Sequence, residues 1–290
     1  MRRVVGVAIA ASAITLAGCP KVGIMDDGSS VSWGPSNDGQ LLSGAQLPRR
    51  GTGFYMPPEW STRGNHFGTD EMIQLIVWTG RQLDVQEPGL AVGIADLSPR
   101  GGGPSQWHRS HQTGRDCDIM FFAREAGGGP IRLTEMVRFD DAGRAVLSDG
   151  RQVLFDVRRN WLLVRTLLEN PVARIQFLFI SDGLKQLLLD HAEQIGEPES
   201  LIEYAGWVLG QPMGALPHDD HLHLRIYCSP DDLAAGCRDR GSQRWYKRDA
   251  KEFVVPRSAS APVSRVGADL GRLPAMLSLS SIPFRGFVPR

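Results

Sequence analysis

The chain lacks an excess of charge of either sign. Its 290 residues include 32 Lys and Arg and 32 Asp and Glu, so the formal net charge is zero. Proteins that bind nucleic acids, or membranes by broad electrostatic attraction, usually carry a clear basic excess. The balance therefore gives no support for a nucleic-acid partner or for that kind of membrane binding. With 42% hydrophobic and 22% charged residues, the composition is that of an ordinary globular protein.

The sequence also lacks a hydrophobic run long enough to cross a membrane. Its most apolar segment extends from Val4 to Ala17, whereas a spanning helix needs roughly 20 residues. The basic start and small-residue end of this segment are typical of a secretory signal peptide. The residues Leu16 to Cys19 also resemble the bacterial lipobox, in which the cysteine is lipidated and becomes the mature N-terminus. A plain cleaved signal and an uncleaved anchor are the alternatives.

Cysteine is scarce, with four in the chain. Cys19 belongs to the lipobox, where it would carry the lipid. Cys228 and Cys237 enclose a short polar loop in a chain expected to be exported, and an oxidising compartment favours a disulfide between them. Cys117 alternates with acidic neighbours in RDCDIMFF, which predicts a small hydrophobic residue in the core rather than a reactive thiol or metal ligand.

The sequence contains no internal repeat and no Gly-rich phosphate loop, and helical and strand patterns do not alternate in a β-α-β rhythm. This favours an α+β fold: a single domain whose central, mainly antiparallel sheet carries a zinc site and is flanked by helices. We expect a lipoprotein signal over 1–19, a flexible tether over 20–43, a metallopeptidase domain over 44–256 and an irregular tail over 257–290.

Local patterns place the elements inside this domain. Apolar residues at helical spacing after a capping residue predict three helices, over residues 71–83, 157–170 and 182–195, capped by Thr69-Asp70, Asp156 and Ser181. A polar loop is expected after the third helix, through Trp207. Apolar or alternating runs predict four strands, over residues 90–97, 115–122, 172–181 and 221–228.

Two motifs carry residues suited to chemistry, SHQTGRDCDI at 110–119 and PHDDHLHLRIYC at 217–228. Side chains alternate along a strand, so His221 and His223 share one face while apolar residues occupy the other. The same rule points Asp118 outward from its strand. His111 lies on the preceding turn, where Gly114 allows the chain to bend back.

These residues fit a catalytic zinc site. Such a site uses three N or O ligands and keeps an open position for water, and His111, Asp118 and one of His221 and His223 supply that set. Mixed imidazole and carboxylate ligands favour zinc over magnesium or calcium. The chain has no HExxH helix, so the second histidine of the HxH pair replaces its glutamate as the candidate base. A coincidental pair of exposed strand histidines is the simpler alternative.

The fuller strings WHRSHQTGRDCDI and HDDHLHLRIYC resemble the motifs of the penicillin-insensitive murein endopeptidases, within the lysostaphin / D-Ala-D-Ala carboxypeptidase group of metallopeptidases. GAQLP and DEMIQLI add to a resemblance that extends from about Gly44 to about Lys251. The resemblance implies one zinc ion per chain, held by His111, Asp118 and His223. His221 would stand beside the metal as base or transition-state stabiliser.

Further positions follow from the same resemblance. His108 and His218 match other histidines that line the site. Asp116 and Asp219 are expected to orient histidines, as carboxylates often do for metal ligands, or else to be solvated acids.

Three more residues near the motifs are candidates for substrate contact. Arg225 suits a substrate carboxylate or a structural salt bridge. Trp107 and Trp207 suit either the wall of a cleft or the edge of the core.

The resemblance implies hydrolysis of the D-alanyl–meso-diaminopimelyl cross-links of peptidoglycan. The attacking group would be a zinc-activated water, so β-lactams, which acylate serine enzymes, should not inhibit the reaction. A D,D-carboxypeptidase of the same group, a non-catalytic peptidoglycan-binding lipoprotein and a structural zinc protein are the rivals. The expected location is the periplasm, with a lipid anchor in the inner or outer membrane; the oligomeric state is left open.

Overall fold

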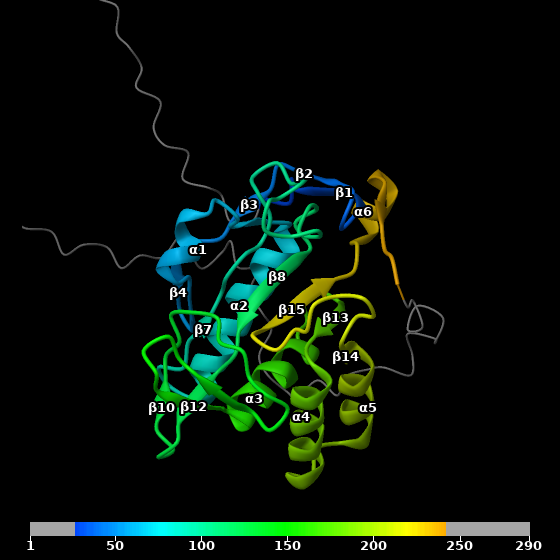
Figure 1. Ribbon diagram of the computed structural model, residues 1–290. Helices are drawn as coiled ribbons and strands as arrows, with labels where there is room; N and C mark the ends of the chain where they lie inside the picture. The colour runs from blue at the N-terminus through cyan, green and yellow to red at the C-terminus, as the bar shows by residue number, and fades with distance from the viewer. Residues whose placement is uncertain (1–26, 242–290) are drawn as a thin grey trace, which may run out of the picture.

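A four-stranded sheet in the middle of the molecule carries both motifs (Figure 1). The structure, a computed structural model, describes residues 27–241. The central strand of this sheet is β15, which pairs antiparallel with β8 on one side and β13 on the other, while β14 runs parallel to β13. The strand bounds are β8 Asp116–Met120, β13 Ile175–Phe179, β14 Leu209–Gly210 and β15 His221–Ile226.

The prediction of one central sheet needs correction, because the other described strands form separate small sheets. Strands of two to six residues, ended by turns, cannot extend into one continuous sheet. One sheet has the order β10-β9-β12-β11, and another the order β16-β1-β2. The bounds are β1 Val31–Pro35, β2 Gln40–Leu42, β3 Ala45–Gln46, β4 Arg50–Gly51, β5 Phe54–Tyr55, β6 Phe67–Gly68, β7 Val92–Gly93, β9 Ala123–Glu125, β10 Pro130–Ile131, β11 Arg144–Val146, β12 Gln152–Phe155 and β16 Cys237–Arg238.

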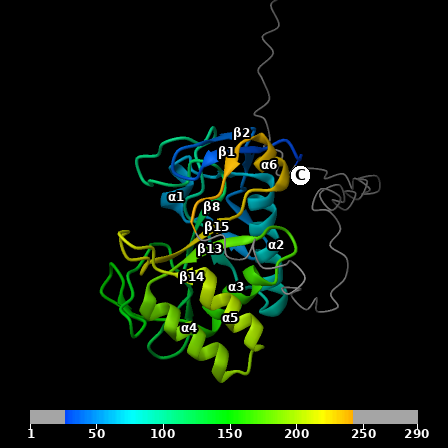
Figure 2. The same cartoon turned by 90° about the vertical axis from the view of Figure 1, so that its right-hand side faces the viewer.

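Helices surround these sheets and share one hydrophobic core with them. Helix α2 packs on α3, and α3 packs on α4 and α5. Figure 2 shows α3, α4 and α5 grouped at the end of the molecule opposite β1, β2 and α6. The helix bounds are α1 Pro58–Thr62, α2 Asp70–Gln86, α3 Val157–Leu168, α4 Asp182–Gln194, α5 Glu199–Val208 and α6 Pro230–Ala235.

Capping residues begin the predicted helices. The Thr69 hydroxyl accepts a hydrogen bond from the Met72 amide, and the Asp156 carboxylate accepts one from the Arg159 amide, so both predicted caps are confirmed. Ser181 precedes α4, but its side chain makes no capping bond. Helix α5 replaces the polar loop expected through Trp207, because Tyr204, Ala205 and Val208 form a buried face at helical spacing.

The expected tether is partly wrong, because the chain is already folded from Val31 onward. Strand β1 pairs with β2 and also, in parallel, with β16 from the far end of the described chain. Ser32 is fully buried, and its backbone amide donates to Asp232, which lies 200 residues away in the sequence. The polar composition of this segment therefore serves distant hydrogen bonds rather than flexibility.

The three cysteines within residues 27–241 are placed as expected. Cys228 and Cys237 form a disulfide. Cys117 is buried in β8, and burial raises the pKa of its thiol well above the ordinary value, so it stays protonated. Cys19 and the tail over 257–290 lie outside the described residues.

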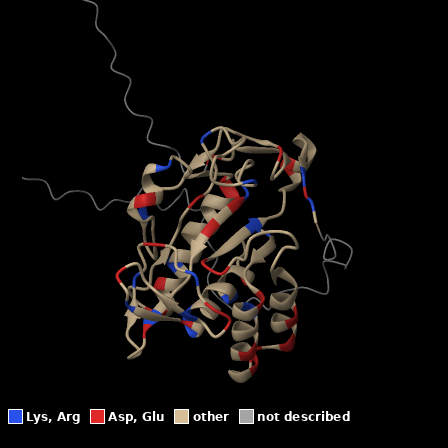
Figure 3. Ribbon diagram, in the orientation of Figure 1, with Lys and Arg blue, Asp and Glu red and all other residues tan. Residues whose placement is uncertain are grey.

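Acidic and basic residues are distributed along the described chain without one dominant sign (Figure 3). Within residues 27–241, no helix combines the length and apolar character needed to cross a membrane.

Candidate metal and catalytic site

The pairing of β8 with β15 brings the two motifs together. In this register His223 lies opposite Asp118 and Arg225 opposite Asp116, so these side chains share one face of the sheet. The expectation that Asp118 points outward needs correction, because this residue is fully buried. The chain segment before β8 folds over the same face, and the Gly114 amide is bonded there to the Ser98 hydroxyl.

Three imidazole nitrogens converge on one oxygen of Asp118. His111 Nε2 and His221 Nε2 each lie 3.3 Å from Asp118 Oδ1, and His223 Nδ1 lies 3.1 Å from it. A tetrahedral ion with bonds of about 2.0–2.1 Å holds its ligand atoms about 3.3 Å apart. The nitrogen–oxygen separations therefore match the edges of a zinc coordination sphere.

Unpartnered atoms support the same interpretation. Among the described residues, neither carboxylate oxygen of Asp118 has a hydrogen-bond donor, and His111 Nε2 has no partner either. A buried charge without a partner is costly. A cation at this point would satisfy all of these atoms at once, so the donor set fits a metal ion.

Each histidine of the cluster is held from behind by an oxygen. The members of this histidine cluster are His108, His111, His218, His221 and His223. His111 Nδ1 lies 2.9 Å from the Leu97 carbonyl, His223 Nε2 lies 2.8 Å from Asp116 Oδ1, and His221 Nδ1 lies 2.6 Å from Asp220 Oδ1. These three outer nitrogens act as donors, which leaves a lone pair on the nitrogen that faces Asp118.

The two remaining histidines are held in a similar way. His108 Nε2 lies 2.9 Å from Asp96 Oδ2, and its Nδ1 lies 3.6 Å from Asp118 Oδ2. The His218 ring nitrogen Nδ1 lies 3.3 Å from the side-chain oxygen of Gln211.

The candidate ligand atoms divide into two groups, His108, His111 and Asp118 on one side and His218, His221 and His223 on the other. The ligand set expected from the sequence, His111, Asp118 and His223, takes members from both. Asp118 connects the groups, because its carboxylate faces histidines of each. The sequence-based set is thus brought together, within a larger cluster of possible ligands.

Burial separates the cluster into two levels. His111 and Asp118 are fully buried and His223 is 6% exposed. The side chains of His108 and His221 are 21% and 17% exposed. The expected metal ligands thus form a buried floor, and the remaining histidines form a rim that a substrate can reach.

The backbone of His111 is strained into the left-handed region, with φ of 64°. A residue with a side chain rarely adopts this conformation unless its surroundings hold it there. The His111 amide donates to Asp116 Oδ2 at 3.3 Å, and the ring is bonded to the Leu97 carbonyl. The structure thus fixes this imidazole at a conformational cost.

The electrostatics of the site favour positive charge next to Asp118. Burial raises the pKa of this carboxyl group, but His111 and His221 outweigh burial and hold it well below its ordinary value. Burial lowers the pKa of His221, yet Asp118 and Asp220 raise it to about 10. Burial, together with His223 and His221, lowers the pKa of His218 to about 4. A proton and a metal ion compete for the same lone pairs in such a site.

Of the other residues predicted from the sequence, Asp116 and Arg225 lie at the site, whereas Asp219 does not orient a histidine. Asp116 is fully buried between His223 and Arg225, whose Nε donates to it at 2.5 Å. Arg225 is thus engaged in a structural ion pair. Asp219 contacts no histidine among the described residues and lies 4.0 Å from Arg138. The carboxylate that orients His221 belongs to Asp220 instead, which the sequence analysis did not single out.

Asp96 is the second residue that the sequence analysis missed. It is fully buried, and besides His108 it accepts a hydrogen bond from Arg63 Nη1 at 2.8 Å. Its backbone carbonyl also accepts from the Asp118 amide. The sequence signal that could have identified Asp96 is its position as the single acid in the apolar run LAVGIADL. A carboxylate in a buried strand is rarely found without a partner.

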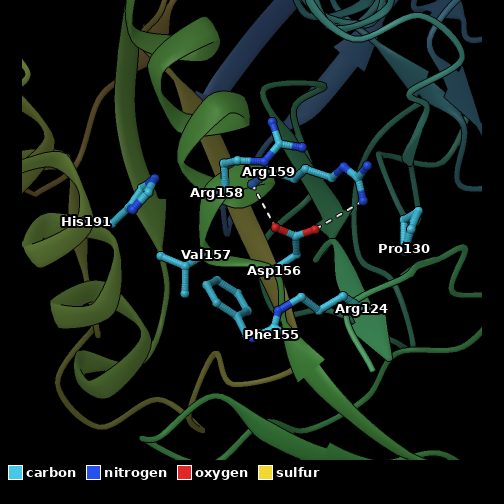
Figure 4. Close-up of a pocket in the computed structure, with 9 residues that line it drawn as sticks. Arg124, Pro130, Phe155, Asp156, Val157, Arg158, Arg159 and His191 are labelled. Carbon is cyan, nitrogen blue, oxygen red and sulfur yellow. Dashed lines mark hydrogen bonds and ion pairs between the residues drawn. The ribbon is translucent and has the colours of Figure 1, made fainter. Parts of the chain in front are cut away.

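A separate pocket lies away from the histidine cluster. It has a volume of about 470 Å³, and none of the histidine cluster lines it. Figure 4 shows Arg124, Phe155 and His191 around it, with Asp156 bonded to Arg159. The candidate site is therefore identified by its convergent ligand atoms and not by this pocket.

Comparisons with known proteins agree with the motifs. The family model described as penicillin-insensitive murein endopeptidase matches residues 32–245. The chain is 27% identical over 239 residues to the penicillin-insensitive murein endopeptidase of Klebsiella pneumoniae strain 342, covering 80% of this chain and 79% of that protein. The proteins of the same name from Escherichia coli O157:H7 and Haemophilus influenzae are each 25% identical, over 239 and 209 residues; these matches cover 80% and 71% of this chain, and 79% and 66% of the relatives.

Proposed function

This chain belongs to the penicillin-insensitive murein endopeptidase family, and we propose that it is a zinc-dependent endopeptidase that hydrolyses D-alanyl–meso-diaminopimelyl cross-links in peptidoglycan. The observation that carries this proposal is the arrangement around Asp118. A buried floor of His111, Asp118 and His223 offers three ligand atoms, and partly exposed histidines stand beside it. Three protein ligands with room for a fourth are typical of catalytic zinc rather than structural zinc.

The floor residues would hold the ion, each with a partner that fixes its orientation. The Leu97 carbonyl orients His111, and Asp116 orients His223. Arg225 in turn keeps Asp116 ionised, because its Nε donates directly to that carboxylate. When bound, a zinc ion here supplies a Lewis acid that polarises the scissile carbonyl and acidifies a water molecule.

His221 is the residue that we propose to move protons. Its Nε2 faces the site, and its Nδ1 donates to Asp220. A cation beside Asp118 would offset the negative charge that raises the pKa of His221. His221 could then accept a proton from the attacking water at Nε2 and deliver it to the leaving amine, while Asp220 stabilises the imidazolium form between these steps. His108 and His218 flank this path and line the site beside His221.

The proposal also includes a location for the protein. The signal peptide and the lipobox at Cys19 support export and lipid anchoring, which would hold the enzyme at a membrane that faces the periplasm. The disulfide between Cys228 and Cys237 is consistent with an oxidising compartment.

The first test is hydrolysis of a defined substrate. We expect the purified full-length protein to convert cross-linked muropeptide dimers into monomers with tetrapeptide stems, as followed by mass spectrometry. A chelator should abolish the reaction and zinc should restore it, because His and Asp ligands favour zinc over magnesium or calcium. Release of only a terminal D-alanine would instead identify a carboxypeptidase. Intact dimers from a zinc-loaded protein would favour a binding function.

A second test concerns Asp96 as a positioning residue. We expect Asp96→Asn to lower kcat about 10–100-fold, with KM and zinc content little changed, because the amide cannot accept well from both His108 and Arg63. Asp149→Asn, at an exposed ion pair with Arg151, is the matched control and should leave kcat unchanged. A variant that lost zinc together with activity would show that Asp96 supports the metal ligands rather than His108.

A further inference from the structure

Trp107 stands at the rim of the site and is 51% exposed. It directly precedes His108, whose ring faces Asp118. Single exposed apolar side chains are common on protein surfaces, so exposure alone indicates nothing. What distinguishes Trp107 is the way in which the protein holds it.

The guanidinium of Arg63 covers one face of the Trp107 ring, with its Cζ 4.3 Å from the ring centroid. The same guanidinium lies 5.1 Å from the ring of Trp60, which is buried. Arg63 also donates to Asp96 at 2.8 Å and forms an ion pair with Glu59. Because these contacts already fix the arginine, stacking on it orients the indole at little further entropic cost.

The loop that carries Trp107 is fastened at its base. The Gly103 amide donates to the Gln112 carbonyl at 2.9 Å, and the Leu41 amide donates to the Gly101 carbonyl at 3.1 Å. A Cβ added at Gly102 would lie 2.1 Å from the Gln112 carbonyl oxygen, so glycine is required for this close approach. The exposed indole therefore projects from a fixed base beside the catalytic histidines.

We propose that Trp107 is a stacking platform for a sugar ring of the glycan strand, a proposal that rests on the proposed function. The C–H face of a pyranose ring is flat and weakly apolar, and its hydroxyl groups remain in water at the edges. An indole that is covered on one face by Arg63 and remains about half exposed suits this amphipathic shape. Arg63 behind the ring disfavours a cationic ligand at the same position, because its charge would repel one.

The length of the substrate is compatible with this position. A stem peptide of three or four extended residues spans roughly 10–14 Å. When the scissile bond lies over the buried floor, the sugar at the other end of the stem lies outside it, at the level of the rim. The methyl side chain of alanine, by contrast, is too small to cover an indole.

The test compares two substrates that differ only in their sugars. Cross-linked dimers that carry the disaccharide, and the same cross-linked peptides without it, are offered to the full-length protein. We expect Trp107→Ala to raise KM about 5–10-fold for the disaccharide dimer and to leave KM for the peptide dimer unchanged. Trp107→Phe should restore most of the loss, because it retains an aromatic face. Trp33→Ala, at a similarly exposed tryptophan on β1, is the control and should change neither value.

Three outcomes would overturn the proposal while leaving the proposed function intact. Wild-type protein could show equal KM for both substrates, Trp107→Ala could raise KM equally for both, or it could raise KM for neither. Failure of the wild type to cleave either substrate would instead overturn the proposed function. Binding without catalysis gives an independent readout: the free disaccharide should shift the NMR signal of the Trp107 indole N–H, assigned with Trp107→Phe, and should leave that of Trp33 in place. No shift at Trp107 would contradict the stacking platform.

Discussion

Alanine at His111 or Asp118 is expected to abolish metal binding and hydrolysis together. Each residue places its ligand atom in a fully buried position, so its removal leaves the ion one ligand short. Metal catalysis contributes several kcal/mol to the stabilisation of a transition state, so kcat/KM should fall at least about 10³-fold. Metal content measured by elemental analysis, alongside muropeptide hydrolysis, checks both parts of the prediction.

A control histidine shows whether the loss is specific. His191 lies on α4 and lines the pocket of Figure 4, outside the histidine cluster. His191→Ala should keep both metal and activity. Asp118→Asn adds a stricter comparison, because it retains the shape of the side chain but removes the charge. If Asp118→Asn bound zinc as tightly as the wild type, the assignment of this carboxylate as a ligand would be wrong.

The second large effect is expected at His221. His221→Ala should retain most of its zinc, because the floor ligands remain, but kcat should fall about 10²–10⁴-fold, the range for a positioned acid–base group. Asp220→Asn should produce a smaller loss, because it removes only the partner at Nδ1. Single-turnover hydrolysis of the muropeptide dimer, with metal content measured on the same samples, separates the two roles.

The comparison with His223 is the informative control. Both histidines lie on β15 and point to the same face, yet His223 is the more deeply buried. His223→Ala should therefore lose metal, whereas His221→Ala should not. A fully active His221→Ala variant, or one that loses its zinc as readily as His223→Ala, would contradict this division of roles.

Alternation along β15 was enough to place His221 and His223 on one face, because the apolar residues between them needed the core. The same rule predicted the burial of Cys117. For Asp118, the alternation rule identified the face of β8 on which the side chain lies. It did not predict that this side chain is buried. The residues that cover this face belong to a separate loop, and periodicity within one strand carries no information about that loop.

Asp96 and Asp220 could not be singled out in the same way. Each is an acid beside an apolar or polar run, and only the fold shows which histidine nitrogen it meets. The assignment of Asp219 to this role differed from the structure by one position, because in the segment before β15 the direction of a side chain follows from turns rather than from a repeating period. The strands β1 and β2 were mistaken for a tether for a related reason, since their hydrogen-bond partners lie far along the chain.

The pairing of β1 with β16 has a consequence for the order of events in folding. Arg115, the residue next to Asp116, is fully buried, and it donates to Ser32 near the start of the described chain and to Asp239 near its end. Contacts between such distant segments form late, because the whole intervening loop must close first. A nascent chain that ends before Asp239 therefore lacks one of the groups that hold Arg115, and the strand that carries Asp116 and Asp118 lacks its final support. Assembly of the site is in this way coupled to synthesis of the chain as far as Asp239, so a shorter nascent chain would not yet present a complete site.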